Sequence, residues 1–296
     1  MNHNHYLLTG ASGFLGSIIY AGLTAKDFKV TKFAGDITSA INLDKELDAD
    51  VIIHAAGKAH FVPKTLQEQK FFYDVNFEGT KNLCTALEKL NLKPASFIFI
   101  STVAVYGVDS EVMVSEDHAL NGKTPYAKSK IMAEEWLCNW AAKNNIILGI
   151  LRLPLVAGIN APGNLGDMIK AIRNGKYFSI GKANARKSMV WCEDIPTVIP
   201  ALATTGGIFN LTDRIHPTFK QLELIIAEKN NRKIKTIPVF IAKLLALTGD
   251  LLGSRFPINS DKLKKITSSL TFNDEKAYRQ LNWKPSSVLE KLSEAL

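Results

Sequence analysis

A tyrosine and a lysine four residues apart, Tyr126 and Lys130, are the side chains of this chain best suited to acid–base chemistry. In a helix this spacing places both side chains on one face, about one turn apart. Pro125 suits a first helical turn, and residues 131–137 contain neither Gly nor Pro, so a helix is expected over about 125–143. A tyrosine with a pKa of about 10 is a poor base, but a nearby ammonium group lowers that pKa. The pair therefore predicts a proton-transferring tyrosine; the alternative is an ordinary surface pair.

A glycine-rich turn follows the first predicted strand, residues 6–9, and precedes a helix-like segment. The turn consists of Gly10, Ala11, Ser12, Gly13, Phe14, Leu15 and Gly16. Gly10 permits a tight turn, Gly13 lets the backbone approach a pyrophosphate, and Gly16 lets the helix pack on the strand. The spacing is G-x-x-G-x-x-G rather than the standard G-x-G-x-x-G, and a plain turn is the alternative. Strand, turn and helix in this order favour a dinucleotide-binding site.

The elements that would position these residues alternate between strands and helices along the chain. Further strands are expected at residues 28–33, 50–54, 96–100 and 146–151, and a helix at about 67–90. This order predicts a Rossmann-like, doubly wound parallel α/β sheet, whose functional residues follow the carboxyl ends of the strands. Thr102 is well placed there to hydrogen-bond a substrate oxygen. His54 ends another strand and is interpreted mainly as structural, whereas Asn76 is an unusual residue for the middle of a helix.

The end of the second predicted strand bears on the choice of cofactor. An acidic residue there would bind the ribose hydroxyls of NAD, but Lys32 is the charged residue at hand and Asp36 comes slightly late. Lys32 is suited to the 2′-phosphate of NADP, or is simply solvated. Asp36 and Ile37 are expected beside the adenine. Both NAD and NADP remain candidates, with a slight preference for NADP.

Composition narrows the class of protein. The chain has 296 residues, 46% of them apolar, and a net charge of +8 without a dense basic run. We therefore expect small phosphorylated ligands rather than nucleic acid. The three cysteines, Cys84, Cys138 and Cys192, have no metal-like spacing, so neither a metal site nor disulfides are expected. The apolar run at 239–252 is too short to span a bilayer, and a cytoplasmic protein with no membrane partner is predicted.

Taken together, several short motifs resemble the extended short-chain dehydrogenase/reductase family, and within it the nucleoside-diphosphate-sugar epimerase/dehydratase group. The motifs that carry the resemblance are Thr9 to Gly16, His54-Ala55-Ala56, Asn76-x-x-Gly79-Thr80, Ser101-Thr102-x-x-Val105-Tyr106-Gly107, Tyr126-x-x-x-Lys130, Arg152-x-Pro154 and Leu281-Asn282-Trp283-Lys284-Pro285. Each motif alone is weak evidence, but together they span nearly the whole chain in the family's order.

The resemblance implies a role for each matched residue. Tyr126 would be the acid/base, Lys130 would hold the nicotinamide ribose and lower the phenol's pKa, and Thr102 would orient the sugar oxygen. The implied cofactor contacts are Gly10, Ser12, Gly13, Phe14, Leu15, Gly16, Lys32, Asp36, Ile37, His54, Ala55, Ala56, Asn76, Ser101, Tyr126, Lys130 and Pro154. The candidate substrate contacts are Lys58, His60, Thr102, Val103, Asn164, Arg186, Lys187 and Arg255. For the cations in this set, a solvated surface position is the alternative.

The resemblance also implies how the chain is divided and assembled. Residues 1–155, with parts of 185–215, would form the NAD(P)-binding domain, and residues 156–296 mainly a smaller α/β lobe for the sugar nucleotide. The two helices expected at 67–90 and 125–143 often pair across a two-fold axis in this family, so a homodimer is expected.

One departure from the family pattern bears on the reaction. The 4,6-dehydratases of the group place an Asp-Glu pair after the active threonine, where this chain has Val103-Ala104. A dehydratase is therefore disfavoured. The expected activity is hydride transfer at C4 of a nucleoside-diphosphate sugar, preferably a UDP-sugar, by an epimerase. An NADPH-dependent 4-keto-sugar reductase is the alternative, and a non-catalytic NAD(P)-sensing protein is less favoured.

Overall fold

Parallel strands form the central sheet, in the order β2-β1-β3-β4-β5-β9. The computed structural model describes residues 5–59, 61–90, 92–252 and 258–296. The strands of this sheet are β1 His5–Thr9, β2 Lys29–Phe33, β3 Val51–His54, β4 Ser96–Thr102, β5 Ile147–Leu153 and β9 Gly207–Asn210. The chain moves outward from β1 to β2 and then returns past β1 to β3, so the strand order reverses between β1 and β3. Ligands of such sheets bind at this reversal, outside the carboxyl ends of the strands.

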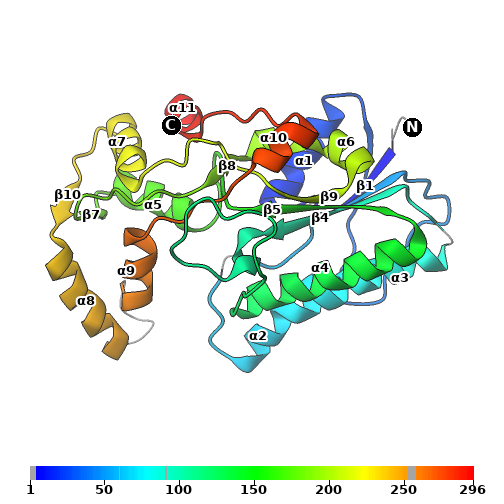
Figure 1. Ribbon diagram of the computed structural model, residues 1–296, viewed down its shortest axis with the longest axis horizontal. Coiled ribbons are helices and arrows are strands. Elements are labelled where there is room, and N and C mark those ends of the chain that lie inside the picture. The colour runs from blue at the N-terminus through cyan, green and yellow to red at the C-terminus, as the bar shows by residue number, and fades with distance from the viewer. Residues whose placement is uncertain (1–4, 60, 91, 253–257) are drawn as a thin grey trace.

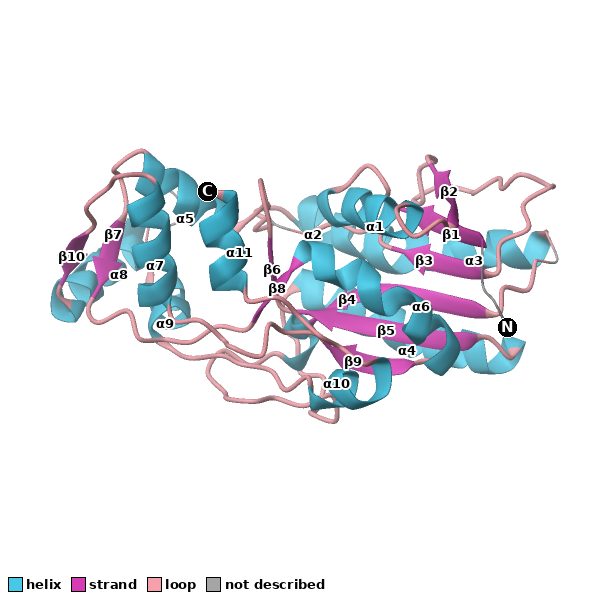
Figure 2. Cartoon of the chain, turned by 90° about the horizontal axis from the view of Figure 1, so that it is seen from above, coloured by secondary structure: helices cyan, strands magenta, loops and turns pink. Residues whose placement is uncertain are grey.

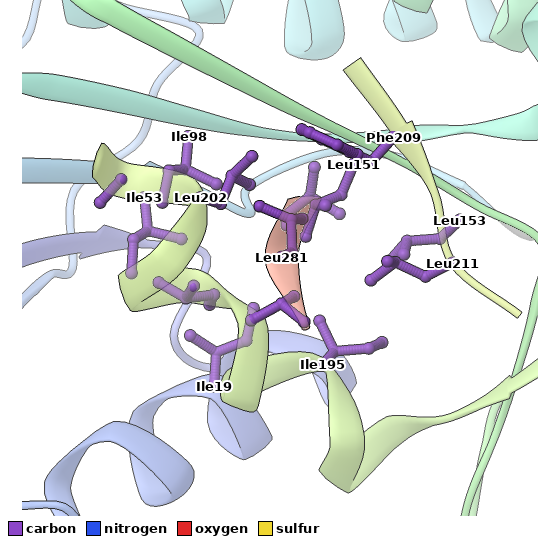
Figure 3. Packing of buried hydrophobic residues seen from close by; sticks show 14 of the residues in the cluster. Ile19, Ile53, Ile98, Leu151, Leu153, Ile195, Leu202, Phe209, Leu211 and Leu281 are labelled. Carbon is purple, nitrogen blue, oxygen red and sulfur yellow. The ribbon is translucent and has the colours of Figure 1, made fainter. Parts of the chain in front are cut away.

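Alternating side chains along the strands build two apolar layers, one on each face of the sheet. Figure 3 shows the first, where Ile53, Ile98 and Leu151 meet Ile19 and Leu202 from the covering helices. The helices on this face are α1 Phe14–Thr24, α6 Ile195–Thr205 and α10 Glu275–Leu281, and those on the other are α3 Gly79–Lys89 and α4 Pro125–Asn144. Figure 1 shows the two sets above and below the sheet. The doubly wound α/β fold predicted from the sequence is confirmed.

The two helices expected to flank the site are present with their own start signals. α4 begins at Pro125, and the hydroxyl of Thr124 caps it by accepting the Ala127 N–H at 3.1 Å. The expected helix at 67–90 is built in three parts: α2 Leu66–Tyr73, a π-helical turn at Asp74–Glu78, and α3. A π turn inserted between α-helices is frequent at functional sites, and this one contains the buried Asn76.

The second lobe packs around helices that follow β6 in the chain. Its main core joins the helices α5 Asn164–Arg173, α7 Phe219–Lys229 and α11 Val288–Ala295 to the short strands β6 Leu155–Ala157 and β8 Met189–Trp191. At its far end lie β7 Phe178–Ile180, β10 Lys235–Ile237 and α8 Val239–Leu252, as Figure 2 shows, and α9 Ser260–Thr267 packs against α8. Within the described residues, no helix combines the length and apolar character needed to cross a membrane.

Candidate active site

The glycine turn after β1 is packed too closely for side chains at two of its positions. Gly10 has a φ of +71°, and a Cβ there would lie 2.5 Å from the backbone nitrogen of Ala56. A Cβ on Gly16 would run into the Gly10 carbonyl oxygen. These two glycines are therefore required by the fold itself.

Gly13 is different, because a Cβ there would meet only the Gly10 carbonyl oxygen, at 3.3 Å. Gly13 is the N-cap of α1, whose first turn has no side-chain cap and no acidic residue. Backbone N–H groups at such a helix start bind phosphate groups. The turn thus fits the pyrophosphate of a dinucleotide, with Gly13 as the place where the ligand approaches the backbone.

His54 lies at the end of β3 inside a directional chain of hydrogen bonds. Thr80 donates to the Asn76 carbonyl at 2.8 Å, so its oxygen is left to accept from His54 Nε2–H, at 3.0 Å. His54 Nδ1 then accepts from the Thr9 hydroxyl at 2.7 Å. Burial, with Lys130 adding a smaller effect, lowers the pKa of His54 to about 3, so the ring is neutral. Both ring nitrogens are occupied within the protein, so the cofactor contact predicted for His54 falls to the backbone that follows it.

Asn76 links three segments that are far apart in the sequence. Its side-chain oxygen accepts the Lys58 N–H at 2.7 Å, and its nitrogen donates to the Lys58 carbonyl at 3.1 Å and to Ser129 Oγ at 3.0 Å. Ser129 in turn donates to the Tyr126 carbonyl at 2.8 Å. The loop after β3, the π turn and the first turn of α4 are therefore held in one arrangement, with the buried Asn76 at its centre.

Thr102 and Tyr126 meet through their hydroxyl groups. The Thr102 oxygen accepts the Ala104 N–H at 3.2 Å, which fixes its orientation at the end of β4. Burial raises the pKa of Tyr126 above its ordinary value, while the hydrogen bond with Thr102 lowers it. The Tyr126 ring packs beside Phe72 of α2, with centroids 5.9 Å apart. The structure thus brings together two of the three residues predicted to be catalytic.

Lys130 lies on the same buried face of α4. Its ammonium donates to the Ile100 carbonyl at 2.9 Å and lies 4.4 Å from the centroid of the Phe99 ring. Burial lowers the pKa of Lys130 to about 8. The sequence predicted that this ammonium lowers the phenol's pKa. Burial sets the direction of the Tyr126 pKa and the Lys130 ammonium is directed at the carbonyl of β4, so its effect on the phenol stays a prediction.

The floor of the site is formed by Gly57. A Cβ on Gly57 would lie 3.1 Å from Asn76 Oδ1 and 3.3 Å from Lys130 Nζ. The preceding residue, Ala56, is the one that touches Gly10. The glycine turn, the loop after β3 and Lys130 are therefore continuous in space, as a dinucleotide site with an adjacent acid–base group requires.

A buried ion pair that was not predicted from the sequence joins the helix of Tyr126 and Lys130 to the sheet. Arg152 of β5 donates to Glu134 of α4 at 2.7 and 3.1 Å, and both side chains are only 3% exposed. Arg152 also donates to the Tyr106 hydroxyl at 3.2 Å, and Glu134 accepts from Ser101. The sequence does contain a sign of this pair. Glu134 follows Lys130 by four residues, so its carboxylate lies on the same face of the helix.

The residues predicted for the adenosine end of the cofactor lie at the end of β2 and just after it. The Lys32 ammonium is 3.5 Å from the centroid of the Tyr20 ring. Asp36 accepts from the backbone and the hydroxyl of Thr38, both at 2.8 Å, which lowers the pKa of Asp36. Ile37 is buried, and its carbonyl accepts from Asn82 at 2.9 Å. The charged residue at the end of this strand is therefore a lysine and not a carboxylate.

The remaining predicted cofactor residues are spread around the turn and the neighbouring strand ends. Ser12 is exposed, Phe14 and Leu15 are half-buried in the first turn of α1, Ala55 and Ala56 are half-buried after β3, and Pro154 is half-buried between β5 and β6. Ser101 is the exception, because its buried hydroxyl is used by Glu134. Its predicted contact with the cofactor is therefore not available to the hydroxyl.

The predicted substrate residues fall into two groups. Lys58 is exposed near the Phe61 and Phe71 rings, and Val103 directly follows Thr102. Asn164 and Arg186 are exposed, and Lys187 is half-buried, all in the second lobe. His60 and Arg255 lie outside the described residues.

The chain is similar to known proteins over most of its length. The sequence profile described as the NAD dependent epimerase/dehydratase family matches residues 6–211. The chain is 29% identical to N-acetyl-alpha-D-glucosaminyl-diphospho-ditrans,octacis-undecaprenol 4-epimerase of Escherichia coli O157:H7, over 94% of this chain and 89% of that protein. It is 26% identical to UDP-glucose 4-epimerase of Vibrio cholerae, over 96% and 92%.

Solved structures share the fold over nearly the whole chain. UDP-glucose 4-epimerase of Thermotoga maritima with UDP-glucose has a TM-score of 0.73 at 20% identity, covering 98% of this chain and 96% of that one. RMD from Pseudomonas aeruginosa complexed with NADPH has a TM-score of 0.76 at 19% identity, covering 97% and 96%.

The Glu134–Arg152 pair yields a stability prediction. Glu134→Gln leaves the Arg152 charge buried without its counter-ion, so we expect the free energy of unfolding to fall by about 3–5 kcal/mol in urea denaturation. Glu294→Gln is the matched control, since its ion pair with Lys291 at 2.8 Å is exposed and its loss should change little. Equal effects of the two substitutions would contradict the structural role given to the buried pair.

His54 yields a prediction about pH. Its pKa is about 3 in the folded protein and about 6.5 when unfolded, so the unfolded chain takes up the proton first as the pH falls. Protonation of His54 should therefore not affect the free energy of unfolding above about pH 6.5. Below that value it should lower the free energy of unfolding by about 1.4 kcal/mol per pH unit. Unfolding measured at pH 7.5, 6 and 5 should show a shallower decline for His54→Leu than for the wild type. Parallel declines would refute the neutral, buried state of His54.

Proposed function

Because the chain belongs to the NAD dependent epimerase/dehydratase family, we propose that it is an NAD(P)-dependent 4-epimerase of a sugar carried on a diphosphate, with a UDP-sugar as the favoured substrate. One observation carries the proposal. Thr102 and Tyr126 share a hydrogen bond, and Lys130 lies beside Gly57, next to the glycine turn.

A nicotinamide held between the glycine turn and Lys130 would supply the hydride acceptor and donor for C4 of the sugar. Tyr126 takes the proton of the C4 hydroxyl as the ketone forms and gives it back on reduction. Thr102, whose oxygen is fixed by Ala104 N–H, orients both the phenol and the sugar oxygen. Since burial raises the pKa of Tyr126, the base role needs a positive field, and Lys130 lies one helical turn away.

The second lobe is the part proposed to hold the substrate diphosphate, with residues 1–155 and parts of 185–215 holding the cofactor. Lys187 is the favoured cation, because burial already lowers its pKa and an anion would offset that cost. The neighbouring Arg186 uses one guanidinium nitrogen on the Ile215 and His216 carbonyls, at 3.4 and 3.1 Å. Arg186 therefore serves first to hold the loop beside the site.

Two alternatives are each supported by a specific observation. The Escherichia coli relative is named for a sugar diphosphate carried on undecaprenol, so a lipid-linked substrate is the second candidate for the same C4 chemistry. A reductase that uses NADPH is favoured by Lys32 at the end of β2, where an NAD enzyme usually has a carboxylate.

We further propose a homodimer that pairs the helices of residues 66–89 and 125–144, and a role in polysaccharide precursor synthesis. A cytoplasmic location is supported by the cysteines, because Cys84, Cys138 and Cys192 are all free thiols.

Removing the Tyr126 hydroxyl tests the acid–base assignment. Tyr126→Phe should lower kcat by about 10²–10⁴-fold, while the affinity for NAD(H), measured by fluorescence titration, stays within a few-fold. Lys130→Ala should weaken both turnover and cofactor binding. Tyr278→Phe, at an exposed tyrosine of α10, is the control and should match the wild type. A Tyr126→Phe enzyme with near-normal turnover would eliminate Tyr126 as the acid/base.

A substrate panel tests the reaction itself. We expect the purified protein to retain NAD and to equilibrate the two C4 epimers of one sugar, with products read by NMR. The panel contains UDP-, GDP- and dTDP-sugars, their 4-keto forms and an undecaprenyl-diphosphate sugar. NADPH consumed in proportion to turnover of a 4-keto sugar would establish the reductase instead.

A further inference from the structure

Helix α8 buries only its smallest residues. Within this helix the buried positions are Ala242, Ala246 and Gly249. Ala242 and Ala246 pack against Leu263 of α9 in a small satellite core. This narrow contact is the attachment of α8 to the rest of the lobe.

The opposite side of α8 carries a row of large apolar side chains. Phe240, Leu244, Leu247 and Leu251 follow the i, i+4, i+7, i+11 pattern of one helix face, and we call them the α8 stripe. They are 66%, 61%, 58% and 88% exposed, respectively. Val239, Ile241, Leu245 and Leu252 widen this apolar surface at its edges. An amphipathic helix normally turns such a face toward a core, whereas here no described part of the chain covers it.

The surroundings of the stripe are strongly basic. Residues 229–265 contain nine Lys and Arg but only two acidic residues, a net +7 out of +8 for the whole chain. Exposed lysines stand on each neighbouring element: Lys235 on β10, Lys243 on α8, and Lys262 and Lys264 on α9. The excess charge, expected from the sequence to serve phosphorylated small ligands, thus falls mostly within the segment of the chain that contains α8 and α9.

We propose that the α8 stripe and its surrounding lysines dock this lobe onto an anionic phospholipid bilayer. Basic residues bordering an exposed apolar helix face match a membrane interface, where acyl chains take up the apolar side chains and anionic headgroups attract the lysines. α8 has 14 residues, too few to span a bilayer, so it lies in the plane of the interface. Figure 1 shows α8 at an outer end of the molecule, where it can reach a flat surface.

The charge of this segment favours a bilayer over a second copy of the chain as the partner of the α8 stripe. Pairing two α8 stripes would bring two segments of net charge +7 together, and like charges oppose such contact. An anionic headgroup layer is complementary to the same charge. The proposal departs from the sequence prediction of no membrane partner and does not depend on the proposed reaction. It would place the lobe that holds Lys187 beside the bilayer surface.

Vesicle sedimentation tests the docking surface. The full-length protein should co-sediment with phosphatidylcholine vesicles that contain a minority of phosphatidylglycerol. It should bind much less to vesicles of pure phosphatidylcholine, and much less to the anionic vesicles at high salt. Leu244→Gln/Leu247→Gln should reduce the bound fraction by about tenfold or more, because two apolar side chains are lost from the interface. Val112→Gln/Leu224→Gln is the matched control, since these apolar side chains are 69% and 55% exposed elsewhere, and it should bind like the wild type.

A fluorescent label reports docking independently of any loss of folding. In a Cys138→Ser background, whose other cysteines Cys84 and Cys192 are buried, Leu244→Cys is labelled with an environment-sensitive dye. Anionic vesicles should raise its emission, but not that of the label at Leu224→Cys. No vesicle binding by the wild type, or equal binding by the stripe variant, would overturn the proposal. A third outcome would also overturn it: a wild-type dimer that does not bind vesicles and that dissociates in Leu244→Gln/Leu247→Gln. The α8 stripe would then be covered by a second copy of the chain.

Discussion

The ion pair between Glu134 and Arg152 is the interaction on which the geometry of the site depends. It joins α4 to β5 in surroundings where both side chains are almost fully buried. A charge in such a place is tolerated only while it is paired and hydrogen-bonded, so α4 cannot rotate or slide over the sheet without a large penalty. Because Glu134, Lys130 and Tyr126 follow one another at intervals of four residues, the pair also fixes the two catalytic candidates at the carboxyl edge of the sheet.

The cofactor side of the site is held by different means. Gly10 and Ala56 approach each other so closely that no side chain fits between them, and Asn76 fastens the loop after β3 to the start of α4. The neutral His54 connects Thr9 to Thr80 beneath this loop. Backbone groups thus line the proposed dinucleotide site, and the polar side chains around it are already satisfied by one another.

The net charge of the molecule is distributed unevenly along the chain. The segment 229–265 carries almost the whole net charge, so the remainder of the chain is close to neutral. Among the described residues, the exposed row of large apolar side chains on α8 lies within that same segment. The sheet and its helices serve the reaction, whereas the far end of the second lobe has the composition of a surface that meets another, negatively charged one.

Local signals in the sequence determined the order of strands and helices, the glycine turn, and helix α4 with its Tyr126 and Lys130. Each rests on neighbouring residues alone: glycines that permit a tight turn, a proline at a helix start, and apolar periodicity. Only the tertiary structure decided that Arg152 neutralises Glu134, that Asn76 reaches Ser129, and that the Lys130 ammonium is directed at the Ile100 carbonyl. It also decided which face of α8 stays exposed. Burial and pairing are set by residues distant in the sequence, and they govern the pKa values and free energies that spacing cannot reveal.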